Sequence, residues 1–338
     1  MVLKGIHDCV NLQEDFCVLK RYAFLVLCYP KISIKALANR LFLPVPIVSA
    51  IKNEMKKKSM VTDISGITLT SKGELIVRME LQIKDLDISR FLQLASMTNC
   101  HELFPEAHDI FEKRPEADVT LDQSKCTIET SFKRAHYLIT HQQVVSGSLL
   151  CVGDDDLVSV AYGFLYRYLT HQKGRDFKVT VVDKDFRVLD YIHNLSSIHQ
   201  LPIDIVFHDL KDPMPKSMNK KYDVMITDPP YTMSGLELFI LRGISCLKRG
   251  REVAIYLSFP VKPPEIRLAV QAFFTSQNIL IDQIIDNFNR YEGAQIIGGV
   301  SNFFSLKTTV DDNFESLNPF TGKLYTREQN PKIRNFSR

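Results

Sequence analysis

The stretch Tyr222-Asp223-Val224-Met225-Ile226-Thr227-Asp228-Pro229-Pro230-Tyr231-Thr232 carries the strongest fold signal in this chain. Its first six residues include a consecutive apolar run of strand-like length, which predicts a buried strand. The two prolines end that strand, because proline lacks an N–H for the ladder and fixes φ in a rigid turn. Asp228 and Tyr231 are therefore expected at the carboxyl end of a strand, where open α/β sheets bind ligands.

The chemistry of this turn suits an amine. The Asp228 carboxylate and a carbonyl such as that of Pro229 can accept N–H bonds while the Tyr231 ring packs beside the amine. An ordinary strand-ending turn with a buried tyrosine is the structural alternative. We therefore looked for a second motif that would meet this turn at the same edge of a sheet.

Such a motif lies upstream, where the apolar strand 148–153 ends at Gly153 and a helix-like run begins at residue 157. A strand, a glycine turn and a helix form the nucleoside-binding opening of a doubly wound sheet. The intervening Asp154-Asp155-Asp156 would repel a pyrophosphate, so the motif disfavours NAD or ATP and favours a cationic ligand. Helix capping is the alternative role for these acids, although one aspartate suffices for a cap.

Two further strands end in acids. Strand 177–182 is followed by Asp183, and strand 201–207 leads to Asp209. An acid after the second strand typically binds ribose hydroxyls, so Gly153, Asp183 and Asp209 are predicted to bind the nucleoside of a donor. The order of elements predicts an α/β fold with a Rossmann-like, methyltransferase-type doubly wound sheet. It is completed by strand 253–258, helix 264–276, and strands 279–288 and 302–306, the last of them antiparallel.

The N-terminal region has a different pattern. Predicted helices at 16–28, from Ser33 and at 44–58 precede a hairpin at 60–69, which together predict a winged helix-turn-helix. The third helix carries basic residues that could face phosphates, although we favour a solvated basic face on an interaction module: Lys52, Lys56, Lys57 and Lys58. The predicted division is a winged-helix-like domain, a helical connector, a Rossmann-like domain and a flexible tail, at residues 1–80, 81–146, 147–310 and 311–338. Closure of the tail over substrate is the alternative to a weakly ordered end.

Composition limits the classes of function. The 338 residues are 45% hydrophobic and 24% charged, as in a globular protein of two domains. A formal net charge of +3 is too small to indicate nucleic acid by itself. The seven cysteines form no CxxC pair, which predicts reduced thiols in a cytoplasm. We expect no membrane span and no signal peptide, because no apolar stretch is long enough.

With these motifs in place, the chain resembles the branched-chain polyamine synthases, also called bis(aminopropyl)spermidine synthases. The resemblance covers the whole chain and rests on these segments: Gly153-Asp154-Asp155-Asp156-Leu157, Asp228-Pro229-Pro230-Tyr231-Thr232, Asn289-Arg290-Tyr291-Glu292-Gly293, Asp122-Gln123, Glu129-Thr130-Ser131 and Lys133-Arg134-Ala135. It implies transfer of an aminopropyl group from decarboxylated S-adenosylmethionine to a secondary amine of spermidine or a related polyamine. It also implies a homodimer formed through the N-terminal domain, and a helix at 127–142 near the donor.

The expected site follows from this chemistry. The decarboxylated donor carries a sulfonium and an ammonium group and lacks a carboxylate, so an acidic turn attracts it and repels the carboxylated form. The attacking nitrogen must be neutral, which requires a group that accepts its proton or orients the free base. We predict Asp228, Asp155 and Tyr231 as catalytic residues, and these as substrate-binding: Asp154, Asp156, Gln123, Pro229 and Glu292. Neither a metal nor another cofactor is required; decarboxylated S-adenosylmethionine is a co-substrate.

Two rival functions use the same motifs. A nucleic-acid amino-methyltransferase would also use an Asp-Pro-Pro-Tyr turn, but it would want a glycine-rich donor loop, and acids beside phosphates would weaken binding. The second rival is a winged-helix regulator whose α/β half senses a metabolite. The acidic turn makes nucleic acid an unlikely partner of the site, whereas the winged helix leaves the regulator open.

Overall fold

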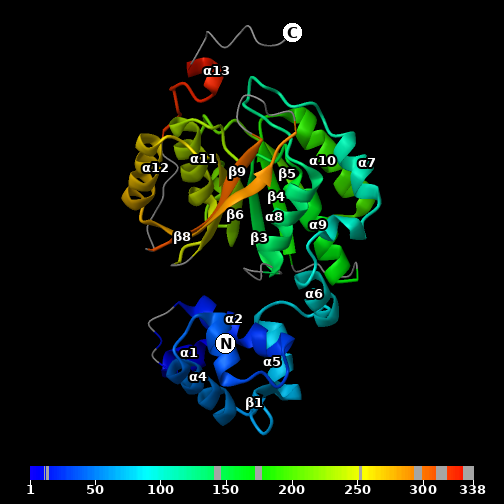
Figure 1. Ribbon diagram of the computed structural model, residues 1–338, viewed down its shortest axis with the longest axis vertical. Coiled ribbons are helices and arrows are strands. Elements are labelled where there is room, and N and C mark those ends of the chain that lie inside the picture. The colour runs from blue at the N-terminus through cyan, green and yellow to red at the C-terminus, as the bar shows by residue number, and fades with distance from the viewer. Residues whose placement is uncertain are drawn as a thin grey trace.

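The protein is described by a computed structural model that covers residues 1–10, 12, 15–140, 146–171, 177–250, 253–292, 299–309 and 318–329. A smaller N-terminal lobe of helices lies below a larger α/β lobe in Figure 1, with α6 (Ile88–Ala95) at the junction. Among the described residues no single helix is long and apolar enough to cross a membrane, and only the bent pair at 34–41 and 45–57 meets those criteria when both helices are taken together.

The N-terminal lobe contains the predicted order of helices and hairpin. Ser33 caps the second predicted helix, where its hydroxyl accepts a hydrogen bond from the Ala36 amide at 3.1 Å. An antiparallel bridge joins Ile32 to Ile67, next to the two-stranded hairpin. Whether this lobe is a winged helix stays a prediction. Its elements are α1 (Val2–Val10), α2 (Phe16–Cys28), α3 (Ile34–Leu41), α4 (Val45–Lys57), β1 (Val61–Thr62), β2 (Thr68–Leu69) and α5 (Ser71–Glu80).

A helical connector joins the lobes. It consists of α6, η1 (Cys100–Leu103), α7 (Glu106–Glu112) and α8 (Ile128–Thr140). Phe91 of α6 packs edge-on against Phe24 of α2, with ring centroids 5.0 Å apart. The amide of Asp87, just before α6, donates to the Leu169 carbonyl in the α/β lobe at 2.9 Å. The connector therefore contacts both lobes, and α8 confirms the helix predicted from residue 127.

The α/β lobe is built on a seven-stranded sheet of order β5-β4-β3-β6-β7-β9-β8. The first five strands in this order are parallel, and β9 pairs antiparallel with both β7 and β8. This mostly parallel sheet is a methyltransferase-like α/β fold and confirms the predicted sheet. Its strands are β3 (Gly147–Val152), β4 (Phe177–Asp183), β5 (Ile203–Phe207), β6 (Val224–Thr227), β7 (Ala254–Phe259), β8 (Ile279–Arg290) and β9 (Val300–Thr308).

Helices cover both faces of this sheet (Figure 1), so its central strands are apolar on both sides. Every residue of β6 is buried, and so are Leu149 to Val152 of β3. The parallel strands end at the upper edge in Figure 1, below α13. The helices are α9 (Val158–Leu169), α10 (Phe186–His199), η2 (Lys216–Met218), α11 (Met233–Cys246), α12 (Pro264–Ser276) and α13 (Thr326–Gln329).

The C-terminal segment differs from the weakly ordered tail that we expected. Leu324 and Tyr325 are buried in the α/β lobe. The Thr232 hydroxyl donates to the Leu324 carbonyl at 2.7 Å, and the Thr326 amide donates to the Asp122 carboxylate at 2.7 Å. Two apolar side chains in a polar stretch are enough to anchor residues 318–329 over the sheet edge; the rest of the predicted tail lies outside the described residues.

Candidate active site

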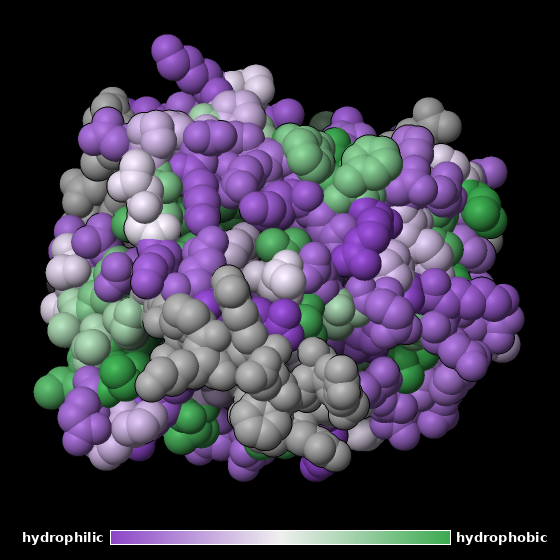
Figure 2. Space-filling model, turned by 90° about the horizontal axis from the view of Figure 1, so that it is seen from above, coloured by the Kyte–Doolittle hydropathy of each residue, from purple (hydrophilic) through white to green (hydrophobic). Residues whose placement is uncertain are grey.

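A pocket opens at the carboxyl edge of the sheet, on the face that Figure 2 views from above. That face is mostly hydrophilic, with apolar residues in small separate groups. The loops after β3, β4, β5 and β6 contribute to the pocket walls, together with the turn before α8 and the C-terminal segment. Eight predicted site residues line it: Gln123, Gly153, Asp155, Asp156, Asp183, Asp228, Pro229 and Tyr231. The structure thus brings together acids from several separate strand ends.

Asp228 stands directly after β6, as predicted. Its Oδ2 atom accepts hydrogen bonds from Arg134 Nη2 at 2.8 Å and from the Tyr291 hydroxyl at 2.6 Å. Its Oδ1 atom is buried and has no hydrogen-bond partner among the described residues. Burial raises the pKa of Asp228 to about 7, although Arg134 acts in the opposite direction. This carboxylate is therefore held in a fixed orientation.

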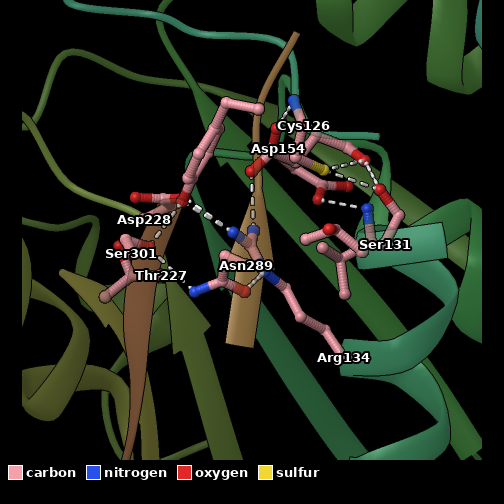
Figure 3. Close-up of polar contacts among 12 residues, drawn as sticks. Cys126, Ser131, Arg134, Asp154, Thr227, Asp228, Asn289 and Ser301 are labelled. Carbon is pink, nitrogen blue, oxygen red and sulfur yellow. Dashed lines mark hydrogen bonds and ion pairs between the residues drawn. The ribbon is translucent and has the colours of Figure 1, made fainter. Parts of the chain in front are cut away.

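Arg134 of α8 is the centre of the polar network in Figure 3. Its Nη1 atom donates to Asp156 Oδ2 at 2.6 Å, and its Nε atom donates to Asn289 Oδ1 at 2.8 Å. The Asn289 amide in turn donates to the Ser301 hydroxyl at 2.9 Å. Only 1% of Arg134 is exposed to solvent. A buried guanidinium thus links α8 and the β8–β9 pair to two carboxylates of the pocket.

The three consecutive acids after β3 have three different environments. Gly153 makes the turn into them with a φ of 74°, a conformation that glycine adopts without strain. The Asp154 carboxylate accepts hydrogen bonds from the amides of Val158 at 2.8 Å and Ser159 at 3.1 Å. These contacts cap α9, and Asp154 does not line the main pocket. The hydrogen bonds of Asp154 show a helix cap, and its binding of substrate stays a prediction.

Asp156 faces the pocket but is bound by the protein. Its Oδ1 atom accepts a hydrogen bond from the Cys126 amide at 2.9 Å, and its other oxygen pairs with Arg134. Burial acts to raise the pKa of Asp156, but the Arg134 charge and the Cys126 hydrogen bond outweigh it and hold that pKa below its usual value. Asp156 is therefore ionised at neutral pH.

Asp155 is the acid of this turn whose carboxyl group is open, which here means accessible in the pocket and not hydrogen-bonded by the described protein. It lines the pocket, keeps part of its surface accessible, and accepts no hydrogen bond within the described part of the chain. Burial raises the pKa of Asp155, and the charges of Asp156, Asp183 and Asp228 raise that pKa further. A carboxyl group of this kind binds a proton or a cationic ligand more readily than an exposed aspartate does.

The predicted nucleoside-binding acids are not equivalent. Asp183 ends β4 and lines the pocket, where its oxygens accept the amides of Asp154 at 3.2 Å and Asp185 at 2.8 Å. Asp209 lies beside the pocket, not in its wall, and pairs with Lys184 at 2.8 Å. That Asp209 binds the nucleoside stays a prediction; in the structure its carboxylate pairs with Lys184, which lines the pocket.

The remaining two residues predicted to bind substrate differ in their position relative to the pocket. Gln123 lines the pocket, but its amide donates to Asp185 at 3.1 Å and its oxygen accepts the Asp118 amide at 2.7 Å. The Glu292 side chain is 57% exposed and pairs with Arg114 at 3.3 Å, outside the pocket wall. Strand β8 ends at Arg290, and beyond it Tyr291 lines the pocket while Glu292 turns toward Arg114; that Glu292 binds substrate stays a prediction.

Aromatic rings form the wall next to Asp228. The Tyr231 ring lies nearly perpendicular to the rings of Tyr291 and Phe259, at centroid distances of 6.4 and 5.9 Å. Acids beside aromatic faces suit a cationic ligand with apolar methylene groups. In the described ranges, no group of three or more His, Cys, Asp and Glu residues has the arrangement of a metal site.

Sequence reasoning did not assign Arg134 or Tyr291 to the site. Both belong to segments that carry the family resemblance, yet neither received a role. A signal was available in α8, where Arg134 shares a helical face with Ser131 and Leu138 and all three are buried. An arginine at an inward position of a helix needs hydrogen-bond acceptors, and those of Arg134 include carboxylates from other parts of the fold.

Comparison with known proteins identifies the family. Residues 102–333 match the family described as branched-chain polyamine synthase A C-terminal domain. The chain belongs to this family. It is 28% identical over 255 residues to the N(4)-bis(aminopropyl)spermidine synthase of Methanocaldococcus jannaschii, which covers 73% of this chain and 70% of that protein. An uncharacterized protein of the same organism is 32% identical over 315 residues, or 90% of this chain and 76% of its own.

A solved branched-chain polyamine synthase shares the fold. The enzyme from Thermus thermophilus, crystallised with N4-aminopropylspermidine and 5'-methylthioadenosine, matches 97% of this chain and 96% of its own with a TM-score of 0.58. The sequence identity in that match is 19%, so the match shows the fold alone. The methyltransferase-like α/β fold of this chain is therefore also the fold of that enzyme.

Proposed function

We propose that this protein is an aminopropyltransferase that moves the aminopropyl group of decarboxylated S-adenosylmethionine to a secondary amine of spermidine or a related polyamine. The observation that carries the proposal is Asp155, an open carboxyl group in a pocket walled by further acids and aromatic rings. Such a pocket attracts a polyamine, which carries several positive charges. Relatives named N(4)-bis(aminopropyl)spermidine synthase support the same reaction.

The donor would lie across the carboxyl ends of β3 and β4. Gly153 lets the backbone approach the nucleoside, and Asp183 offers its carboxylate to the ribose hydroxyls. The 5'-methylthioadenosine bound to the Thermus enzyme is the product that such a donor leaves behind. The negative charge of Asp156 favours a donor whose side chain ends in an ammonium group and disfavours one that also carries a carboxylate.

The transfer is a displacement at carbon. The lone pair of the neutral acceptor nitrogen attacks the methylene carbon next to the sulfonium, so an N–C bond forms as the C–S bond breaks. The electron pair of the broken bond remains on sulfur and gives the neutral thioether. Asp155 accepts the proton that the acceptor nitrogen loses, because it lines the pocket and because burial and the neighbouring acids raise its pKa above the ordinary value.

The other acids have supporting roles. Asp228 and Asp156 supply negative charge beside the reacting cations, and the Tyr231 ring packs against the acceptor. The seven cysteines all lie in the described part of the chain and form no disulfide, in keeping with a reducing compartment, and we propose the cytoplasm. A homodimer formed through the N-terminal lobe is likewise a proposal.

The test is a donor comparison. The purified protein is incubated with spermidine and either decarboxylated or ordinary S-adenosylmethionine, and the amine products are identified by mass spectrometry. We expect aminopropylated spermidine with the decarboxylated donor only. An Asp155→Asn variant should lose the product, whereas Asp204→Asn, at an acid that pairs with Lys178 on the surface, should keep it. Methyl transfer to nucleic acid, or donor binding without any amine product, would overturn the proposal.

A further inference from the structure

Arg134 contacts both of the pocket carboxylates that flank the open one. Its three nitrogen groups reach Asn289, Asp156 and Asp228 at 2.6 to 2.8 Å, and Nη2 also donates to the Tyr291 hydroxyl at 3.0 Å. The planar guanidinium provides these donors in a fixed fork, which a lysine ammonium cannot reproduce. Asp156 and Asp228 come from different loops, so this one side chain fixes their relative position.

Hydrogen bonds within the β8–β9 pair support this arrangement of Arg134. The Asn289 side chain donates to the Ser301 hydroxyl at 2.9 Å and to the Asn302 carbonyl at 3.1 Å. The Tyr291 hydroxyl lies 2.9 Å from the same serine hydroxyl and donates to Asp228. Arg134 is thus held on one side by an amide that the strands orient, and its charge is directed toward the carboxylates (Figure 3).

We infer that Arg134 is a positioning residue for the reaction proposed above, and that Tyr291 assists it. Together they bind Asp156 and the Oδ2 atom of Asp228, and Asp155 is left as a pocket carboxyl group that no described residue binds, so we assign the proton to it. The inference rests on the proposed function. Arg134 makes its contacts with the protein's own carboxylates, so it acts on the acceptor amine only through them.

The physical reason lies in the balance of buried charge. The guanidinium compensates two carboxylates that would otherwise repel the charge of Asp155, and removing one partner of a buried pair leaves an uncompensated charge. Without Arg134, Asp155 would hold its proton to higher pH and would be a poorer acceptor at neutral pH. A buried ion pair that only stabilises the fold would lower stability when it is broken and would leave the pH dependence of turnover unchanged.

The experiment compares pH profiles of variants. Arg134→Lys keeps the charge but loses the fork, and Tyr291→Phe removes one hydrogen bond from Asp228 with little change in volume. For each protein, kcat and KM for spermidine are measured from acid to alkaline pH at saturating decarboxylated donor, together with the melting temperature. Arg242→Lys is the matched control, because Arg242 is also buried but its hydrogen bonds go to the carbonyls of Leu210, Lys211 and Asn318.

We expect Arg134→Lys to lower kcat by at least about tenfold, with a smaller change in KM, and to move the acid limb of the profile to higher pH. Tyr291→Phe should move the limb in the same direction by less, and it remains informative if the arginine variant does not fold. Arg242→Lys should lower the melting temperature without moving the limb. If the acid limb of the pH profile stays at its parent position in both Arg134→Lys and Tyr291→Phe, the inference is overturned.

A second measurement separates this inference from the proposed reaction. Carbon-13 NMR titration of aspartate carboxyl groups follows proton binding at Asp155 without turnover, with Asp155→Asn used to assign its signal. Arg134→Lys should raise the titration midpoint of that signal. If the parent protein transfers no aminopropyl group, the proposed function fails, but a raised midpoint would still support the positioning role. An unchanged midpoint would reject that role even in an active enzyme.

Discussion

Aspartates in the two lobes of this protein have opposite electrostatic environments. In the N-terminal lobe, Asp63 lies on the surface, and hydrogen bonds from Lys56 and Lys52 lower its pKa to about 2. In the α/β lobe, burial raises the pKa of Asp228 to about 7, even though Arg134 contacts it. The two side chains differ because lysine ammonium groups stabilise the charge of Asp63 at the surface, whereas burial disfavours the charge of Asp228 in the pocket.

The numbers of charged residues in the two parts of the sequence do not reveal this difference between the aspartate environments. Residues 1–80 contain twelve Lys and Arg against seven Asp and Glu, whereas the rest of the chain contains thirty against thirty-two. The basic excess therefore belongs to the lobe whose ion pairs are exposed, where each pair contributes little and is screened by salt. The nearly balanced lobe holds the acids that shape the pocket. Local burial, and not net charge, indicates where the chemistry takes place.

The largest effect on kcat should come from substitution of Asp155, the open carboxyl group of the pocket. Asp155→Asn keeps the size of the side chain and removes its capacity to accept a proton, so we expect kcat to fall by about 10²–10⁴-fold. Steady-state kinetics with spermidine and decarboxylated donor measures this loss. Calorimetric titration with 5'-methylthioadenosine serves as the control for an intact nucleoside site. Parent-like turnover would assign the proton to another group.

A smaller but still large effect on kcat is expected at Asp228, whose carboxylate is bound by Arg134 and Tyr291. Asp228→Asn leaves the Arg134 charge only partly compensated and removes negative charge next to the acceptor, so kcat should fall by about 10²-fold. Binding of the donor should change much less, because its proposed nucleoside contacts are made by Asp183 and Gly153 and not by Asp228. A loss of donor affinity as large as the loss of turnover would mean that Asp228 binds the donor.

The capping acid should affect stability. Asp154→Ala removes the hydrogen bonds to the first turn of α9, which should lower the free energy of unfolding by about 1–2 kcal/mol at acid pH. Burial raises the folded pKa of Asp154 to about 7, from an ordinary value of 3.8. Its contribution is therefore complete below about pH 4 and declines as pH rises through about 7. Urea unfolding from pH 4 to pH 8 should show a flatter dependence in the variant than in the parent protein.

The smallest effect belongs to the N-terminal surface. Replacing Lys52, Lys56, Lys57 and Lys58 together with glutamine removes exposed pairs such as Lys56 with Asp63, 2.6 Å apart. We expect a change in unfolding free energy of about 1 kcal/mol or less and unchanged aminopropyl transfer at any salt concentration. Circular dichroism checks the fold. A collapse of activity in a folded variant would show that charge on this lobe takes part in the catalytic cycle.

Much of the fold and part of the site were predictable from local sequence. The apolar run before Asp228, the two prolines and the glycine turn at Gly153 defined strand ends, because strand burial and backbone stereochemistry depend on nearby residues. The capping role of Asp154 was recognised as an alternative, but nothing in three identical consecutive residues indicated which would point inward. Asp209 and Glu292 were placed at the correct strand ends, yet their side chains turn toward Lys184 and Arg114.

By itself, the sequence determined a mostly parallel sheet with acids at its carboxyl edge, since periodicity and turn residues act over short distances. Only the tertiary structure decided which acid is open. Arg134 lies 22 residues before Asp156 and 94 before Asp228, and its fork meets both only after α8 has packed beside the sheet. A buried carboxylate is fixed by whichever cation the fold brings to it, because an unpaired charge in the interior is costly. Asp155 is left open because the Arg134 guanidinium binds Asp156 and Asp228, and no described residue donates a hydrogen bond to the Asp155 carboxyl group.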